Sequence, residues 1–310
     1  MALHQVSGRW RLGLLLALLT AALWATLPVA LKIALVAVDP WTLTWFRFLF
    51  AVLGLGGWLA WRGKLVAFRG LSRKHWTMLA LAAVMLIGNY VLYLFGLHYT
   101  TPANAQLLIQ LAPLLMAVGG VVIFRERFGG GQWLGLAILL GGLCLFFRDQ
   151  LSQLAASGDA GPTYIFGSVL VVLGAVVWAI YALIQKQLLL RLGSALILVF
   201  IYFVATLALW PMATPSQLAG LQASQWLALI YCALNTLGAY GAFAEALAHW
   251  EASRVSLVLA VTPLLTLLSV EVAHHVAPQL VQPEVVGLLG IIGAAMVVGG
   301  SALTSLLGRK

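Results

Sequence analysis

The sequence predicts an all-α integral membrane protein of ten transmembrane helices, arranged as two inverted five-helix repeats. Three observations predict this fold class: the composition, ten long apolar runs, and a residue pattern that recurs half a chain later. Of the 310 residues, 63% are apolar and only 8% are charged, whereas soluble domains carry roughly 25% charged residues. With a mean hydropathy of +1.04, the chain belongs in a lipid bilayer.

Ten apolar runs are long enough to cross a hydrocarbon core about 30 Å thick. They lie near residues 12–36, 41–61, 76–98, 103–124, 131–147, 163–188, 194–212, 225–248, 253–276 and 283–307. Each run is predicted to be a helix, because lipid offers no partners for backbone polar groups. The segments between the runs are too short for a soluble domain. The first run is interpreted as a helix and not as a cleaved signal peptide.

The basic residues predict the orientation. With a cytoplasmic N-terminus, all but three of the 17 Lys and Arg residues fall on cytoplasmic segments, the exceptions being Lys32, Arg47 and Arg148. Because cytoplasmic loops of membrane proteins are enriched in Lys and Arg, we expect a multi-pass protein of a bacterial-type inner membrane with both termini in the cytoplasm. The net charge of +9 is then explained by orientation and by contact with anionic lipid, without nucleic acid.

One pattern recurs between the two halves of the chain. Trp24 and Trp178 are 154 residues apart (178 − 24), and Lys32 and Lys186 are separated by the same distance (186 − 32). Further along, an offset of 150 holds without a gap for 40 positions, from Trp76 paired with Trp226 to Leu115 paired with Leu265. Paired Trp, Gly, Tyr and Pro residues at one offset are not expected from apolar composition.

The repeat predicts two units, residues 1–150 and residues 151–310. Each unit holds five crossings, an odd number, so the second unit enters the membrane from the opposite side. Inverted repeats of this kind are typical of secondary transporters, in which two similar halves alternate access around a midplane site.

Four segments resemble the EamA type of the drug/metabolite transporter superfamily: LWATLPVALK, DPWTLTWFRF, LAPLLMAVGGVVIFRERF and GQWLGLAILLGG. The resemblance covers essentially the whole chain. It implies ten helices, a central cavity between the halves, export or exchange of small metabolites, and a structural role for Arg47. One departure concerns Arg125-Glu126-Arg127, whose counterpart in the second half is VEVAHHVAP with Glu271 displaced.

Polar residues inside the apolar runs are the first candidates for substrate binding. One face of run 225–248 carries residues at spacings of 4, 3, 4, 3 and 4, namely Tyr231, Asn235, Gly238, Ala242, Glu245 and His249. Two further pairs are four residues apart, namely Asn89 with Tyr93 and Gln106 with Gln110. These side chains suit a cavity wall, and the alternative for each is hydrogen bonding to a neighbouring helix.

Aromatic residues are the second group of candidates. Trp24 and Trp178 lie in mid-helix, away from the interfaces where tryptophan usually anchors membrane proteins. They are expected to form aromatic walls of one cavity, and the alternative is packing between helices. Together with four tyrosines they favour an amphiphilic or aromatic substrate. The tyrosines are Tyr90, Tyr93, Tyr181 and Tyr240.

Ionisable residues suggest where ion coupling could occur. Glu245 and His249 are the expected coupling residues, because a carboxylate inside a membrane is often a proton-relay site. The alternative is a hydrated residue near the cytoplasmic end, paired with Arg254. Glu271 and His274 have the spacing of half a metal site. A second half is absent from the sequence, so neither a metal nor a cofactor is expected.

The function predicted from these features is secondary active export of a small metabolite, with amino acids or other amphiphilic or aromatic compounds as the best candidates. Efflux of drugs or cationic compounds, or a channel-like facilitator, are the alternatives. An enzyme is not expected, since no convergent nucleophile–base pair or metal cluster occurs. The expected partners are a small-molecule substrate and the bilayer, and a monomer is expected to suffice.

Overall fold

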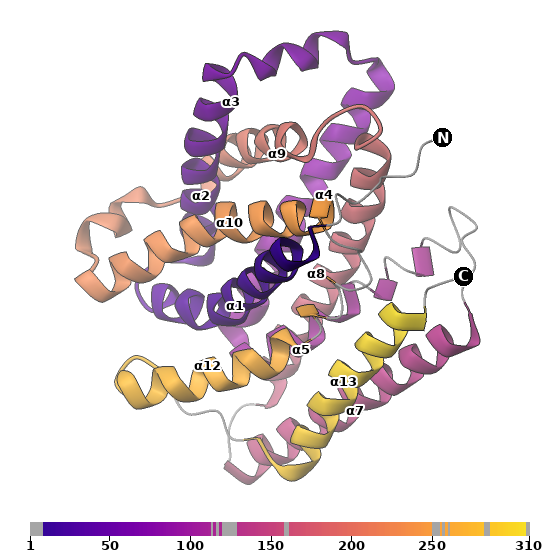
Figure 1. Cartoon of the computed structure of the whole chain (residues 1–310). Helices are drawn as coiled ribbons and strands as arrows, with labels where there is room; N and C mark the ends of the chain where they lie inside the picture. The colour runs from indigo at the N-terminus through magenta and orange to yellow at the C-terminus, as the bar shows by residue number, and fades with distance from the viewer. Residues whose placement is uncertain are drawn as a thin grey trace.

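The computed structural model describes residues 9–307, apart from 113, 116–117, 120–128, 158–160, 250–254, 256–257, 260 and 282–285. Within these residues every regular element is a helix (Figure 1). The α-helices are α1 (Trp10–Leu35), α2 (Pro40–Ala51), α3 (Gly57–Trp61), α4 (Arg73–Tyr99), α5 (Pro102–Leu108), α7 (Gly130–Ser157), α8 (Gly161–Leu188), α9 (Ser194–Leu209), α10 (Ala223–His249), α12 (Thr262–Val276) and α13 (Leu288–Leu307).

Seven helical segments of the described chain are long and apolar enough to cross a membrane. They are Trp10–Leu35, Pro40–Trp61, Arg73–Tyr99, Gly130–Ser152, Gly161–Gln185, Ser194–Met212 and Ala223–Phe243. Each coincides with one predicted run, and the second joins α2 to α3 through a π-helical segment, Val52–Gly56. The run 283–307 contains a shorter apolar helix, Leu288–Thr304. Runs 103–124 and 253–276 lie partly outside the described residues, so ten crossings stay a prediction.

Capping residues explain where two of the helices begin. The Asp39 carboxylate accepts hydrogen bonds from the backbone N–H groups of Trp41 and Thr42, at 2.8 and 3.1 Å, and Pro40 occupies the first helical position of α2. Thr101 caps α5 in the same way, again followed by proline. A side-chain acceptor at the cap and a proline just after it are the usual signals of a helix start.

The main helix contacts join the first half of the chain to the second. α1 packs on α10, α4 on α8, α2 on α9, α5 on α12 and α7 on α13. In the α4–α8 pair, Asn89 bonds to Gly174, whereas Gly96, further along α4, lies against Gly167, earlier in α8. The two helices are therefore antiparallel.

Helices α7 and α13 lie side by side along one edge of the molecule (Figure 1). Glycines let their backbones touch: a Cβ built on Gly142 would lie 2.6 Å from the carbonyl O of Gly293, and one on Gly135 would lie 2.8 Å from that of Gly300. Such contacts require residues without side chains, as at other close helix crossings in membranes. The order of the paired glycines shows that this pair is antiparallel too.

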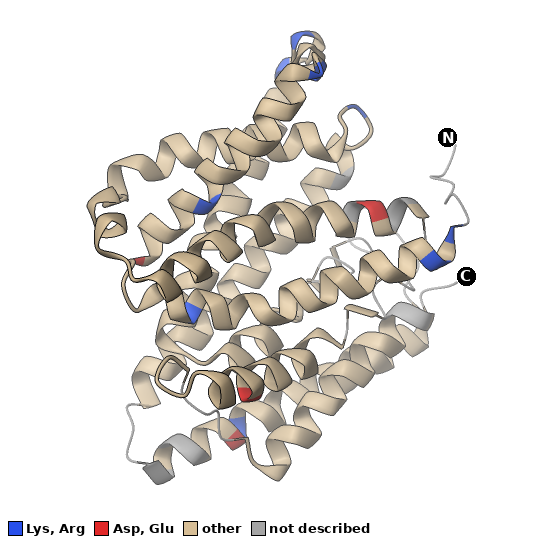
Figure 2. Ribbon diagram, turned by 60° about the vertical axis from the view of Figure 1, so that its left-hand side comes forward, with Lys and Arg blue, Asp and Glu red and all other residues tan. Residues whose placement is uncertain are grey.

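The connection between α3 and α4 and the first turn of α4 carry a group of basic residues, visible as blue segments at the top of Figure 2. Their side chains are exposed, and they are Arg62, Lys64, Arg69, Arg73 and Lys74. Exposed tryptophans stand beside them, with the Arg62 guanidinium 5.4 Å from the Trp61 ring. Basic and tryptophan side chains together are typical of a segment at the membrane–water interface.

Candidate functional site

An aromatic cluster lies where six helices, α1, α2, α4, α8, α9 and α10, approach one another. It is defined by Trp24, Arg47, Phe48, Tyr90, Trp178, Tyr181, Tyr202, Tyr240 and Phe243. Each of the six helices contributes at least one of these side chains. Sites that bind small molecules are usually lined by apolar and aromatic groups with a few polar atoms among them, and this cluster has that composition.

Tyr240 occupies the middle of the cluster. Its hydroxyl is hydrogen-bonded to the side chains of Tyr90 and Trp178, and the indole N–H can only be the donor. On its other side the Trp24 ring lies edge-on, with the ring centroids 5.8 Å apart. Tyr240 therefore joins the two tryptophans that the sequence pairs across its halves.

Two hydroxyl-bearing rings of the cluster are deeply buried. Tyr202 on α9 contacts Phe48 of α2, with ring centroids 5.7 Å apart. Tyr181 on α8 is only 1% exposed, and its hydroxyl has no hydrogen-bond partner among the described residues. A buried polar atom left unpaired carries a cost of about 1–3 kcal/mol. A ligand that bonds to this hydroxyl would recover part of that cost.

Arg47 supplies the positive charge of the cluster. The residue is 4% exposed, and its guanidinium carbon lies 4.9 Å from the centroid of the Tyr90 ring. Its Nε donates to the Thr236 hydroxyl at 3.1 Å, while that hydroxyl donates its own proton to the Cys232 carbonyl at 2.9 Å. The cation–π contact and the single hydrogen bond orient the guanidinium.

The structure brings together most of the aromatic residues predicted from the sequence. Trp24, Tyr90, Trp178, Tyr181 and Tyr240 all belong to the cluster.

The predicted pair of glutamines lies beside one further tyrosine. The Tyr93 hydroxyl donates to Oε1 of the buried Gln106 at 3.3 Å. Gln110 is partly buried, and its amide nitrogen has no partner among the described residues. The amide nitrogen of Gln110 is thus a free donor just after the end of α5.

The two predicted asparagines hold helices together. The Asn89 side chain of α4 donates to the Gly174 carbonyl of α8 at 3.0 Å. The Asn235 side chain of α10 donates to the Leu23 carbonyl of α1 at 2.7 Å. These bonds match the alternative that the sequence left open for them, hydrogen bonding between helices.

The residues of the stripe predicted on α10 differ in burial. Asn235 and Ala242 are buried, whereas Gly238 and Glu245 are exposed. The Glu245 side chain is 66% exposed and lies 3.5 Å from the His249 ring. Glu245 shares its face with the exposed Leu234, because positions 11 apart align on a helix. Arg254, the other expected partner, lies outside the described residues.

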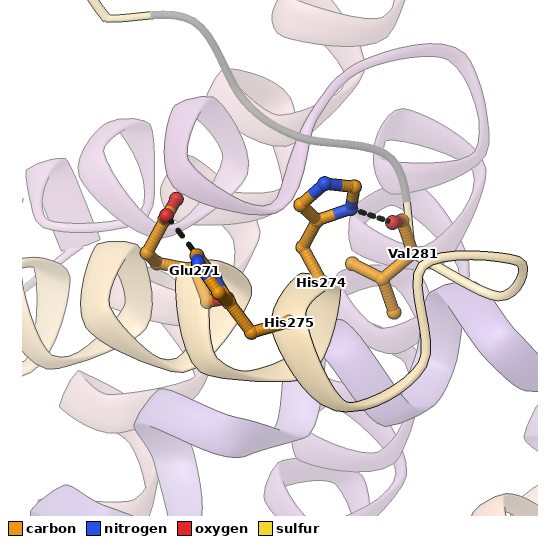
Figure 3. A network of polar contacts seen from close by, with 4 residues as sticks. All are labelled: Glu271, His274, His275 and Val281. Carbon is orange, nitrogen blue, oxygen red and sulfur yellow. Dashed lines mark hydrogen bonds and ion pairs between the residues drawn. The ribbon is translucent and has the colours of Figure 1, made fainter.

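Glu271 and His274 have the sequence spacing of half a metal site, but their side chains contact different partners (Figure 3). The Glu271 carboxylate lies 3.3 Å from the ring of His275, whereas His274 bonds to the Val281 carbonyl at 2.8 Å. Across the described residues no group of three metal-binding side chains is found.

Arg47 and Tyr202 belong to the cluster and Thr236 is bonded to Arg47, but none of the three was predicted as a site residue. One signal was available, since Tyr202 stands 154 residues after Phe48, at the same offset as the two tryptophans. The contact of Arg47 with Thr236 joins residues 189 positions apart, and no local pattern encodes it.

A bundle of membrane-length helices around a buried aromatic cluster defines a multi-pass membrane protein. The chain belongs to the EamA-like transporter family, which matches it twice, at residues 11–148 and 165–304.

Known proteins similar to this chain are also transporters. The uncharacterized inner membrane transporter YhbE of Escherichia coli K12 is 39% identical over 96% of this chain and 92% of its own length. An uncharacterized transporter of Haemophilus influenzae is 37% identical over 96% of both chains. The aromatic amino acid exporter YddG of Ancylobacter novellus is 25% identical over 93% of this chain and 95% of its own.

A crystal structure shares the fold, with a TM-score of 0.64 and 21% identity over 98% of this chain and 99% of the other. The family and the relatives together make this protein a multi-pass transporter of the inner membrane.

Proposed function

We propose that the protein is a secondary active transporter that exports small amphiphilic or aromatic metabolites, with aromatic amino acids as the leading substrates. It works by alternating access, with ten helices in two inverted repeats, residues 1–150 and 151–310. The observation that carries this proposal is the position of Tyr240 between Trp24 and Trp178. These aromatic groups come from both halves and meet in one cluster.

Contacts between equivalent residues support the inverted repeat. Tyr90 and Tyr240 are equivalent at the offset of 150 and are bonded to each other, as expected beside a pseudo-twofold axis. Gly135 and Gly142 correspond to Gly293 and Gly300 at a common offset of 158 (293 − 135 and 300 − 142). Gly135 lies against Gly300, the equivalent of Gly142, and Gly142 lies against Gly293, the equivalent of Gly135. The two helices of this pair are antiparallel. An axis in the membrane plane would produce this reversal of direction.

The substrate class is supported by the cluster and by one relative. Aromatic rings favour a ligand with an apolar or aromatic part, and the similar protein of Ancylobacter novellus is named an aromatic amino acid exporter. The buried Arg47 disfavours the alternative of cationic drugs, because like charges repel strongly in a low-dielectric site.

Counterflow into proteoliposomes tests the proposed function. Vesicles preloaded with unlabelled L-tryptophan should take up labelled L-tryptophan transiently above its equilibrium level, because alternating access lets trans substrate accelerate cis flux. A channel-like facilitator gives no overshoot. Absence of counterflow with L-tryptophan and L-phenylalanine would refute aromatic amino acids as substrates.

The topology prediction follows from the basic residues. Reporter fusions placed after Lys74 and after Lys310 should both score as cytoplasmic, and one near Asp159 as periplasmic, because Lys and Arg favour the cytoplasmic side. A periplasmic C-terminus would contradict both the ten-helix count and the inverted repeat.

Proton coupling through Glu245 and His249 stays a prediction. If this pair carries the proton, Glu245→Gln should abolish uphill transport driven by a pH gradient. Exchange at equal pH should survive, since exchange needs only the site and the conformational change. The exposure of Glu245 lowers the cost of its charge and weighs against the role. A Gln variant that still concentrates substrate removes Glu245 from the mechanism.

A further inference from the structure

Arg47 is a buried cation for which the described residues supply no anion. It is 4% exposed, and its contacts there are the Thr236 hydroxyl and the Tyr90 ring, both uncharged. A charge removed from water without a counter-charge destabilises a fold. Inside a membrane segment such a residue indicates a functional site.

The second half of the chain shows that the position of Arg47 in its helix can be filled by an uncharged residue. α2 begins at Pro40 and α9 at Ser194, which differ by 154 (194 − 40), the offset of the two tryptophans. At that offset Arg47 corresponds to Ile201, which is fully buried. Since an aliphatic side chain suffices at the equivalent position, packing alone does not explain the guanidinium.

The guanidinium is oriented, yet most of its donors are unused. Arginine has five N–H donors in a planar fork, and Nε bonds to Thr236. Thr236 gives its proton to Cys232, so its oxygen can act only as the acceptor for Arg47. The terminal N–H groups have no hydrogen-bond acceptor among the described residues. Such a fork matches the two oxygens of a carboxylate.

We propose that Arg47 binds the carboxylate of the transported substrate, while the apolar part of the substrate packs on the aromatic cluster. This inference rests on the proposed function and narrows it to carboxylate-bearing substrates. The unpaired Tyr181 hydroxyl offers a second polar contact in the same cluster. Thr236 is a positioning residue, because it acts on the substrate only through Arg47.

Matched ligands test the role of the carboxylate. Binding to the purified full chain is measured for L-tryptophan against L-tryptophanamide, L-phenylalanine against L-phenylalaninamide, and indole-3-acetate against indole-3-acetamide. Each carboxylate should bind at least about tenfold more tightly than its amide, the size expected of a charged hydrogen bond. Equal binding within the pairs, or no binding of any carboxylate, overturns the inference.

Variants test whether Arg47 is the residue that distinguishes carboxylates from their amides. Arg47→Gln should lower carboxylate affinity to the level of the amide and leave amide affinity unchanged. Arg47→Lys should keep part of the preference, since it keeps the charge without the fork, and Thr236→Val should reduce the preference severalfold. A preference that survives Arg47→Gln also overturns the inference. Should that variant fail to fold, the ligand pairs on wild-type protein still decide.

Counterflow separates this inference from the proposed function. Carboxylate-selective binding without counterflow supports the site at Arg47 and refutes transport of these compounds. If the amides show counterflow as fast as the acids, the proposed transport is supported, and the inference that Arg47 binds the substrate carboxylate is refuted.

Discussion

Gly300→Ala is expected to destabilise the protein by about 3 kcal/mol, whereas Gly299→Ala, one residue earlier in α13, is expected to be tolerated. A Cβ on Gly300 would lie 2.5 Å from the backbone N of Leu139 and 2.6 Å from the carbonyl O of Gly135. Both obstacles are backbone atoms of α7, so the two helices must separate. A Cβ on Gly299 meets no atom within 4 Å.

The thermal unfolding midpoint of the two purified variants measures the difference. Gly142 and Gly141 form a second matched pair on α7. A Cβ on Gly142 would meet the Gly293 backbone at 2.6 Å, but one on Gly141 meets only the flexible end of Met296 at 3.4 Å. If Gly300→Ala and Gly299→Ala unfold at the same temperature, the close α7–α13 contact does not support the fold.

These glycine pairs illustrate where sequence-based inference stops. Gly141 and Gly142 are adjacent and identical in type, and only the partner helix distinguishes them. Hydrophobicity and length predicted seven of the helices well, because the bilayer imposes them locally. The pairing of α7 with α13 depends on contacts more than a hundred residues apart, and no local period encodes it.

In the candidate site, too, the sequence identified some residues but did not predict the surroundings of others. Tryptophan and tyrosine are rare in mid-membrane and recur in both halves, so the sequence identified Trp24, Trp178 and Tyr240. Helical spacing also placed Asn235 and Glu245 on one stripe, yet one is buried and the other is exposed. Periodicity groups residues by angle around the helix axis, and a stripe can run along the boundary between a packed face and an exposed one.

Trp24→Ala and Trp178→Ala are expected to weaken substrate binding by about 30-fold each, the effect of losing an aromatic anchor worth 2 kcal/mol. Trp24 contacts the Tyr240 ring and Trp178 donates to its hydroxyl. Each variant therefore removes one contact of the same tyrosine. Apparent affinity for L-tryptophan in the counterflow assay is the measurement. Trp58→Ala is the control, since Trp58 is exposed outside the cluster and its loss should leave affinity unchanged.

Trp178→Phe separates the two contributions of that tryptophan. It keeps an aromatic ring beside Tyr181 and removes the N–H that bonds to Tyr240. If the ring is the substrate contact, affinity should fall only a few-fold; if orientation of Tyr240 matters more, the loss should approach that of the alanine variant. Should both alanine variants transport with wild-type affinity while unfolding at a lower temperature, Trp24 and Trp178 serve helix packing alone, and the substrate contacts lie elsewhere in the bundle.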